Sequence, residues 1–258
     1  VHQARALTDG IVTQSKPLYK APRTTVSQDQ GNFRIHFNFP GRNLPDHGDH
    51  GYGPLATVVE SYMDPGTLIG MHPHRNEEII SWVPDGVMRH DDRQGNELVT
   101  DSDHLLVMNA GREFWHEERT LAEDPPLRML QIFVRPHSLG LEPQLQHEPI
   151  PAPVEAEWRH LFGPPGTAAP LFVRNQVHCH DVWLPEGASV EFPTVDDWAT
   201  YFYVFEGAVT VAGTGFERAE SGLLVTGDEA MTAMSDAVVV AFSIDPTAPV
   251  TRQGTIGR

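Results

Sequence analysis

Residues 64–86 read DPGTLIGMHPHRNEEIISWVPDG, a proline and glycine turn followed by two histidines and an apolar run. Successive side chains of a β-strand face opposite sides, so His72 and His74 share one face. Further along the chain, residues 114–119 read FWHEER, and the same rule places His116 and Glu118 on one face. Two such strands can offer three imidazoles and one carboxylate to a single metal ion.

Short β-rich runs separated by turn clusters surround this stretch. They include FRIHFNF (33–39), LATVVESYM (55–63), EEIISWV (77–83), HLLVMNA (104–110) and RMLQIFV (128–134). The 22 glycines and 22 prolines supply many turns, and helical periodicity is almost absent. This pattern predicts an all-β chain folded as sandwiches or barrels.

The second half of the chain repeats the plan of the first. IISWVPDG (79–86) and YFYVFEG (201–207) are both apolar strands that end in an acidic residue and a glycine. Between the halves, residues 142–158 read EPQLQHEPIPAPVEAEW, a proline-rich connector. We therefore expect two tandem β-modules, residues 1–141 and 159–258, joined by a linker over 142–158. Residues 1–30 are weakly patterned and are interpreted as an arm or an edge strand.

Composition narrows the class of protein. The 258 residues carry 18 basic and 35 acidic side chains, a net charge of −17, which makes direct nucleic-acid binding an unfavourable reading. Cys179 is the single cysteine, so no disulfide forms within the chain, and any metal is held by imidazole and carboxylate. No run of about 18 apolar residues predicts a membrane span, and no apolar signal core opens the sequence. We expect a cytoplasmic protein.

The spacing over residues 66–86, G-x5-H-x-H-x3-E followed by Gly86, resembles the cupin motifs. It is most similar to the pirin family, and especially to the bacterial pirins described as quercetin 2,3-dioxygenases. The motifs that carry the resemblance are HPHR (72–75), VPDG (83–86), HDDRQGN (90–96) and MNAGREFWHEE (108–118). The resemblance covers roughly residues 30–150. It implies two tandem cupin β-barrels, a bicupin.

The same resemblance implies a metal site. His72, His74, His116 and Glu118 would hold one divalent ion, with iron as the first choice and Mn, Co, Ni, Cu or Zn as alternatives. Glu118 would also accept a proton from the substrate, because a carboxylate at the metal lies within reach of an acidic hydroxyl. Glu78 is expected to orient His74 through its free ring nitrogen.

Three further side chains are candidates for the substrate pocket. Phe114 shares a face with His116, Met108 could line an aromatic-sized slot beside the metal, and Arg112 could meet an anionic group.

The activity implied by the resemblance is a metal-dependent dioxygenase. It would cleave a flavonol such as quercetin, or a related enol-bearing aromatic, so its partners would be a small aromatic substrate and O2. The alternative is a non-enzymatic, metal-binding regulator with a protein partner. A third reading is an isomerisation or hydrolysis at the same ion.

The second module is expected to be metal-free. The places that correspond to His72 and His116 hold Pro193 and Ala237, which have no liganding side chain. The His178-Cys179-His180 stretch has no partner HxE strand and is interpreted as an ordinary strand. His47, His50, His90 and His104 are interpreted as solvated residues of turns and strand ends.

Overall fold

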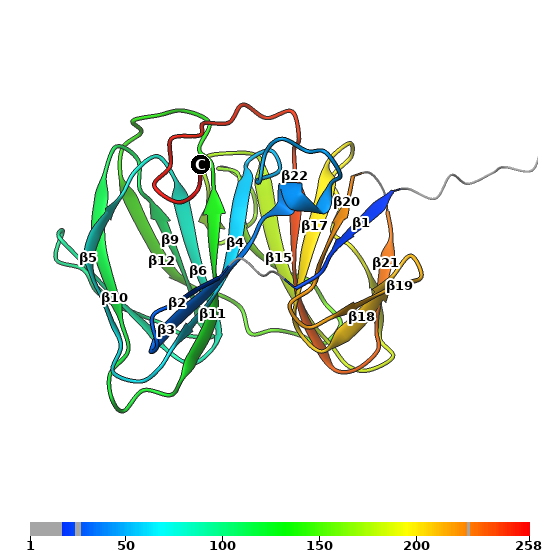
Figure 1. The fold of residues 1–258 in the computed structure, drawn as a ribbon, viewed down its shortest axis with the longest axis horizontal. Coiled ribbons are helices and arrows are strands. Elements are labelled where there is room, and N and C mark those ends of the chain that lie inside the picture. The colour runs from blue at the N-terminus through cyan, green and yellow to red at the C-terminus, as the bar shows by residue number, and fades with distance from the viewer. Residues whose placement is uncertain (1–16, 24–26, 226–227) are drawn as a thin grey trace, which may run out of the picture.

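The computed structural model describes residues 17–23, 27–225 and 228–258, and its regular structure is almost entirely β-strand. The strands form two modules that lie side by side (Figure 1). Within the described residues the single helix is a 3-10 turn, η1 (Pro40–Asn43), and nothing there is helical and apolar over a length that could cross a membrane. The all-β prediction is confirmed.

The first module pairs a seven-stranded sheet with a four-stranded sheet. The larger sheet has the order β12-β9-β6-β11-β4-β3-β2, and the smaller one β5-β10-β7-β8. The strand bounds are β2 (Ser27–Asp29), β3 (Phe33–Asn38), β4 (Leu55–Met63), β5 (Leu68–His74), β6 (Glu78–Asp85), β7 (Met88–Asp92), β8 (Glu97–Thr100), β9 (His104–Asn109), β10 (Phe114–Arg119), β11 (Leu127–Val134) and β12 (Gln144–Pro149).

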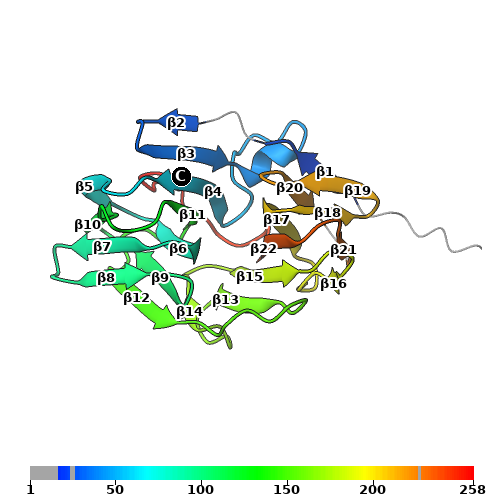
Figure 2. The ribbon, with the colours of Figure 1, turned by 90° about the horizontal axis from the view of Figure 1, so that it is seen from below.

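The second module repeats this arrangement. Its seven-stranded sheet has the order β1-β20-β17-β22-β15-β13-β14, and its four-stranded sheet β16-β21-β18-β19. The strand bounds are β1 (Leu18–Ala21), β13 (Arg159–Gly163), β14 (Leu171–Phe172), β15 (Val177–Leu184), β16 (Ser189–Glu191), β17 (Ala199–Glu206), β18 (Ala208–Val211), β19 (Thr214–Glu217), β20 (Ser221–Leu224), β21 (Ala230–Ala233) and β22 (Ala237–Ile244). Figure 2 shows the two smaller sheets at the outer ends of the molecule.

The two seven-stranded sheets pack against each other across the centre of the molecule. Ile80 and Trp82 of β6 join Tyr201 and Tyr203 of β17 in one buried apolar cluster. Ile79, on the opposite face of β6, packs inside the first module. Because both faces of such a strand are buried, its sequence is a continuous apolar run, which explains the stretch IISWV.

Both ends of the described chain cross between the modules. β1 pairs with β20 of the second module, and the chain then supplies β2, an edge strand of the first. The edge-strand alternative predicted within residues 1–30 therefore describes these two strands, while residues 1–16 and 24–26 lie outside the described residues. Residues 245–258, which we call the return segment, run from β22 back to the first module (Figure 1).

The connector is more ordered than its composition indicates. Residues 144–149 form β12, which pairs along its whole length with β9 of the first module. Pairing ends at Pro149, and Pro151 follows it, because proline cannot donate to a ladder of backbone hydrogen bonds. The free part of the predicted linker over 142–158 is correspondingly short, and the proposed division into residues 1–141 and 159–258 stays a prediction.

Candidate metal centre

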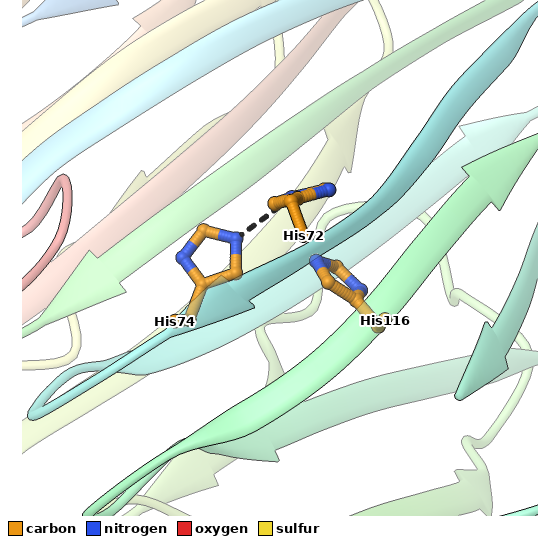
Figure 3. Close-up of side chains that lie close together, drawn as sticks. All are labelled: His72, His74 and His116. Carbon is orange, nitrogen blue, oxygen red and sulfur yellow. Dashed lines mark hydrogen bonds between the residues drawn. The ribbon is translucent and has the colours of Figure 1, made fainter. Parts of the chain in front are cut away.

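Three histidines converge inside the first module. β5 and β10 are antiparallel neighbours, and their register sets His72 opposite His116 and His74 opposite Phe114. The three ring centroids are 4.6–5.0 Å apart. One nitrogen of each ring lies within 4.8 Å of the others, and Figure 3 shows the rings facing a common point. The cross-strand pairing therefore brings together side chains that are distant in sequence.

Hydrogen bonds orient the two histidines of β5. His72 Nδ1–H donates to the Gly70 carbonyl over 2.8 Å, and His74 Nδ1–H donates to Glu77 Oε1 over 2.5 Å. Because both partners are acceptors, Nδ1 carries the proton of each neutral ring and Nε2 keeps its lone pair. These two Nε2 atoms are 3.0 Å apart. Two facing lone pairs are unfavourable alone and suit a cation placed between them.

A relay behind the cluster orients the third ring. His90 Nε2 lies 3.1 Å from Asp92 Oδ2, and His90 Nδ1 lies 3.3 Å from His116 Nδ1. If His90 donates to the carboxylate, it accepts from His116, whose Nε2 is then unprotonated. That Nε2 is buried without a hydrogen-bond partner. A buried polar atom without a partner is costly, and a metal ion would satisfy it.

Burial favours the neutral form of His116 and of His72. Burial, followed by the neighbouring histidines, lowers the pKa of His116 well below its usual value. Burial is likewise the main reason that the pKa of His72 is lowered. Neutral imidazole is the form that binds metals. The donor chemistry of the described residues therefore fits a divalent ion held by nitrogen ligands.

Glu118 lies beside the histidines and lines the same cavity as His72 and His74. Its side chain is buried, and Gln131 Nε2 donates to its Oε1 over 2.5 Å. Burial raises the pKa of Glu118 to about 7, although His74 and Gln131 act in the opposite direction. The register of β10 against β5 shifts between His116 and Glu118. The converging group itself consists of the three histidines without Glu118.

The cavity has a volume of about 180 Å³. Its apolar lining includes Phe33, Ile35, Phe37, Val59, Ile69 and Phe133. Larger hollows of about 320 and 440 Å³ lie on the second module and near the connector, but among the described residues no converging ligand group faces them. The small cavity is therefore the one that combines an apolar wall with candidate ligands.

The predicted pocket residues lie elsewhere. Phe114 and Met108 are buried in the apolar cluster that contains Phe133, and neither of them lines the cavity. Arg112 is exposed and forms an ion pair with Glu142. The cavity wall comes instead from β3, β4 and β11, because these strands of the larger sheet face the histidines across the barrel.

Two expectations about nearby residues are wrong. Glu78 does not orient His74, because its carboxylate binds Arg174 of the second module and Asn109. Glu77 takes that role. His90 is fully buried rather than solvated. The alternation of β7 could have indicated this, since His90 and Asp92 share the buried face of that strand.

The second module contains another histidine cluster. His160 of β13 is paired with His180 of β15, and their rings stack with centroids 4.3 Å apart. His160 Nε2 lies 3.0 Å from His178 Nδ1. The His178 and His180 centroids are 6.4 Å apart, and this trio is not among the converging groups of the described residues.

Comparison with known proteins places this geometry in context. Residues 21–134 match the pirin family. PA1210 of Pseudomonas aeruginosa, provisionally named a quercetin 2,3-dioxygenase, is 29% identical over 218 residues, covering 83% of this chain and 92% of that protein. The Escherichia coli K12 protein named quercetin 2,3-dioxygenase is 23% identical over 210 residues, 81% of this chain and 90% of its own.

Solved structures agree in fold. The crystal structure of YhhW from Escherichia coli matches with a TM-score of 0.78 at 19% identity, covering 90% of this chain and 99% of its own. A second structure of YhhW, described as a bacterial pirin in complex with nickel(II), matches with a TM-score of 0.77. The predicted fold of two tandem cupin barrels is confirmed by this likeness.

Proposed function

Because residues 21–134 form a pirin domain, we propose that the protein is a metal-dependent dioxygenase that acts on an enol-bearing aromatic such as a flavonol. His72, His74 and His116 would hold the ion, and Glu118 beside them would complete the set. Iron is the first candidate for the native ion. The names of the curated relatives support this substrate class.

The observation that carries the proposal is the convergence of one ring nitrogen from each of His72, His74 and His116 beside an apolar cavity that the first two line. His116 Nε2 is buried without a hydrogen-bond partner, as are His36 Nδ1 and His180 Nδ1, but among the described residues only His116 belongs to a group of three converging nitrogens. A divalent ion at this point would polarise a bound enol and template its encounter with O2. The apolar walls exclude water from that encounter.

Glu118 is the residue proposed to accept the hydroxyl proton. Without an ion, burial raises the pKa of Glu118 to about 7, and the charge of a divalent ion bound beside it would lower that pKa and favour the carboxylate, the form that accepts a proton. Gln131 holds Oε1 by its amide N–H and fixes the orientation of the carboxyl group. Its position on the cavity puts it within reach of a ligand bound beside the histidines.

The test is aerobic incubation of the iron-loaded protein with quercetin, following loss of its near-visible absorbance and the mass of the product. Glu118→Gln should lower kcat by about 10²–10⁴-fold, the usual contribution of a positioned acid or base. Glu117→Gln is the matched control, because Glu117 is adjacent on β10 but points to the other face, toward Arg119.

Ring opening with oxygen incorporation would support the proposal. A metal-loaded protein that turns over neither quercetin nor the single-ring catechol with any of Fe, Mn, Co, Ni or Cu would overturn it and favour the regulatory alternative.

A further inference from the structure

The return segment, residues 245–258, ends against the first module (Figure 1), where the Gly257 N–H donates to Glu77, three residues after His74. Arg135 Nη2 donates to the Arg258 carbonyl over 2.9 Å, and Thr255 Oγ1 accepts from the Arg75 N–H over 2.9 Å. Arg75 directly follows His74. The second module therefore supplies backbone next to a candidate ligand of the first.

One carboxylate joins this segment to the cluster. Glu77 is fully buried, and its Oε1 accepts from His74 Nδ1. Its Oε2 accepts the backbone N–H of Ile256 over 2.9 Å and that of Gly257 over 2.6 Å. All three partners are donors, so the position requires a group with acceptors only. A carboxylate meets that requirement.

The approach of the segment depends on glycine. A Cβ at Gly257 would lie 3.1 Å from Phe133 Cβ and 3.2 Å from Glu77 Oε2, and a Cβ at Gly254 would lie 2.9 Å from the same oxygen. Glycine at both places lets backbone pack directly on the carboxylate. The contact therefore depends on a carboxylate in the first module and on two glycines in the return segment.

Ile256 extends the contact to the cavity. Its side chain lines the cavity together with His72 and His74, and it is 37% exposed, so it stands at the mouth. The cavity volume of about 180 Å³ is below the roughly 300–1,000 Å³ of pockets that enclose drug-sized ligands. With Ile256 in place, the space suits one aromatic ring better than a whole flavonol.

We propose that Glu77 and the return segment form a positioning and specificity device for the metal centre. The segment holds Glu77, Glu77 fixes the proton of His74 on Nδ1 and so frees Nε2 for the ion, and Ile256 restricts the cavity to a single-ring enol or one ring of a larger substrate. This inference rests on the metal site of the proposed function.

Glutamine at position 77 separates this proposal from a merely structural role. An amide has one acceptor oxygen and one NH2 group, whereas the site presents three donors. If the oxygen stays with Ile256 and Gly257, the NH2 faces His74 Nδ1 and drives the imidazole proton to Nε2. If the oxygen turns to His74, the NH2 opposes two backbone N–H groups and releases the segment.

The first experiment compares Glu77→Gln with Glu60→Gln by calorimetric titration with Ni2+. Glu60 is the matched control because it is also buried and bridges the modules, accepting from Tyr203 and Arg128, but it does not contact the histidines. We expect Glu77→Gln to weaken nickel binding by about 10–100-fold, the usual loss when an outer partner of a ligand is removed. Glu60→Gln should bind as the wild type does.

Two readouts on the metal-free protein accompany the titration. Imidazole 15N shifts report the tautomer of His74, and amide hydrogen exchange reports the hydrogen bonds of Ile256 and Gly257. Glu77→Gln should change at least one of them. Unchanged shifts, exchange and nickel affinity would overturn the inference. A wild type that binds no metal would instead sink the proposed function, while the two readouts would still test the link between Glu77 and the segment.

The second experiment tests Ile256 as the specificity residue. Quercetin and catechol are titrated into the nickel-loaded protein, and binding is followed by the visible spectrum of the ion. Ile256→Ala should improve quercetin affinity relative to catechol by about tenfold, the scale of a few methylenes in an apolar pocket. Leu68→Ala, an exposed apolar residue of β5 outside the cavity lining, is the control. An unchanged ratio would remove Ile256 from the proposal.

Discussion

The two modules each hold a histidine cluster of the same local plan, and the clusters differ in what surrounds them. In each, two histidines stand one residue apart on a strand and a third lies on the antiparallel neighbour, opposite one of them. In the first module, Gly70 and Glu77 accept hydrogen bonds from the Nδ1–H groups of His72 and His74. The Nε2 lone pairs of these two rings then face each other. In the second, His160 and His178 can share one proton between them.

The comparison shows that strand register alone does not make a metal centre. Register brings imidazoles within a few ångströms, but the acceptors on their outer nitrogens decide whether the inner nitrogens can bind a cation. In the second module a hydrogen bond joins His160 to His178, whereas His180 Nδ1 is buried without a partner and belongs to no group of three converging nitrogens among the described residues. We therefore propose one metal ion per chain, held in the first module.

The largest effect should come from comparing the same histidine-to-alanine substitution in the two clusters. His116→Ala removes the ligand with the unpartnered Nε2 and should abolish retention of Ni2+ or Fe2+. His180→Ala should leave the metal content at one ion per chain. Elemental analysis after dialysis measures both. A drop in metal content on His180→Ala would contradict the distinction between the modules.

The next largest effect concerns the ion pairs that anchor the return segment. This segment reaches the histidine cluster of the first module only. Asp49 accepts hydrogen bonds from Arg135, whose side chain is fully buried, and from Arg252 of the segment. Asp49→Asn leaves a buried guanidinium without its ion-pair partner and should reduce the free energy of unfolding by about 3–5 kcal/mol. Denaturant titration at neutral pH provides the measurement. A loss below 1 kcal/mol, on the order of a surface pair, would show that the anchor is dispensable.

The same carboxylate predicts a dependence on pH. Burial alone would raise the pKa of Asp49, but hydrogen bonds from Arg135 and Arg252 hold it well below its usual value. A lowered folded-state pKa contributes stability above the ordinary aspartate pKa, and this contribution is lost as the pH falls below it. The wild type should therefore lose stability more steeply than Asp49→Asn as the pH falls below about 4. Parallel unfolding curves for the two proteins would contradict this assignment.

The smallest effect tests the relay behind His116. His90→Phe keeps a ring of similar size but removes the acceptor for His116 Nδ1, so nickel affinity should fall by about tenfold. His104→Phe is the control, since His104 is half-exposed and pairs with Asp101 in a turn. Equal affinities for both variants would mean that His90 only fills space. Isothermal titration with Ni2+ resolves a difference of this size.

Sequence reasoning anticipated part of the site and missed the rest for a physical reason. The period of two in a strand is local, so the shared face of His72 and His74 follows from the sequence alone. Alternation could not show which of Glu77 and Glu78 accepts the hydrogen bond from His74. Asn76 adopts a left-handed conformation with φ 52° just before them, and this turn directs Glu77 to the cluster while β6 directs Glu78 to the second module.

The sequence by itself determined the all-β class, the two-module plan and the pairing of histidines on one face, because these follow from alternation and turn composition. Only the tertiary structure decided which acceptors fix the imidazole protons, that His90 is buried, and that Ile256 closes the cavity. Those features depend on contacts between segments as much as 180 residues apart, such as Glu77 with Gly257, and local patterns carry no information about them.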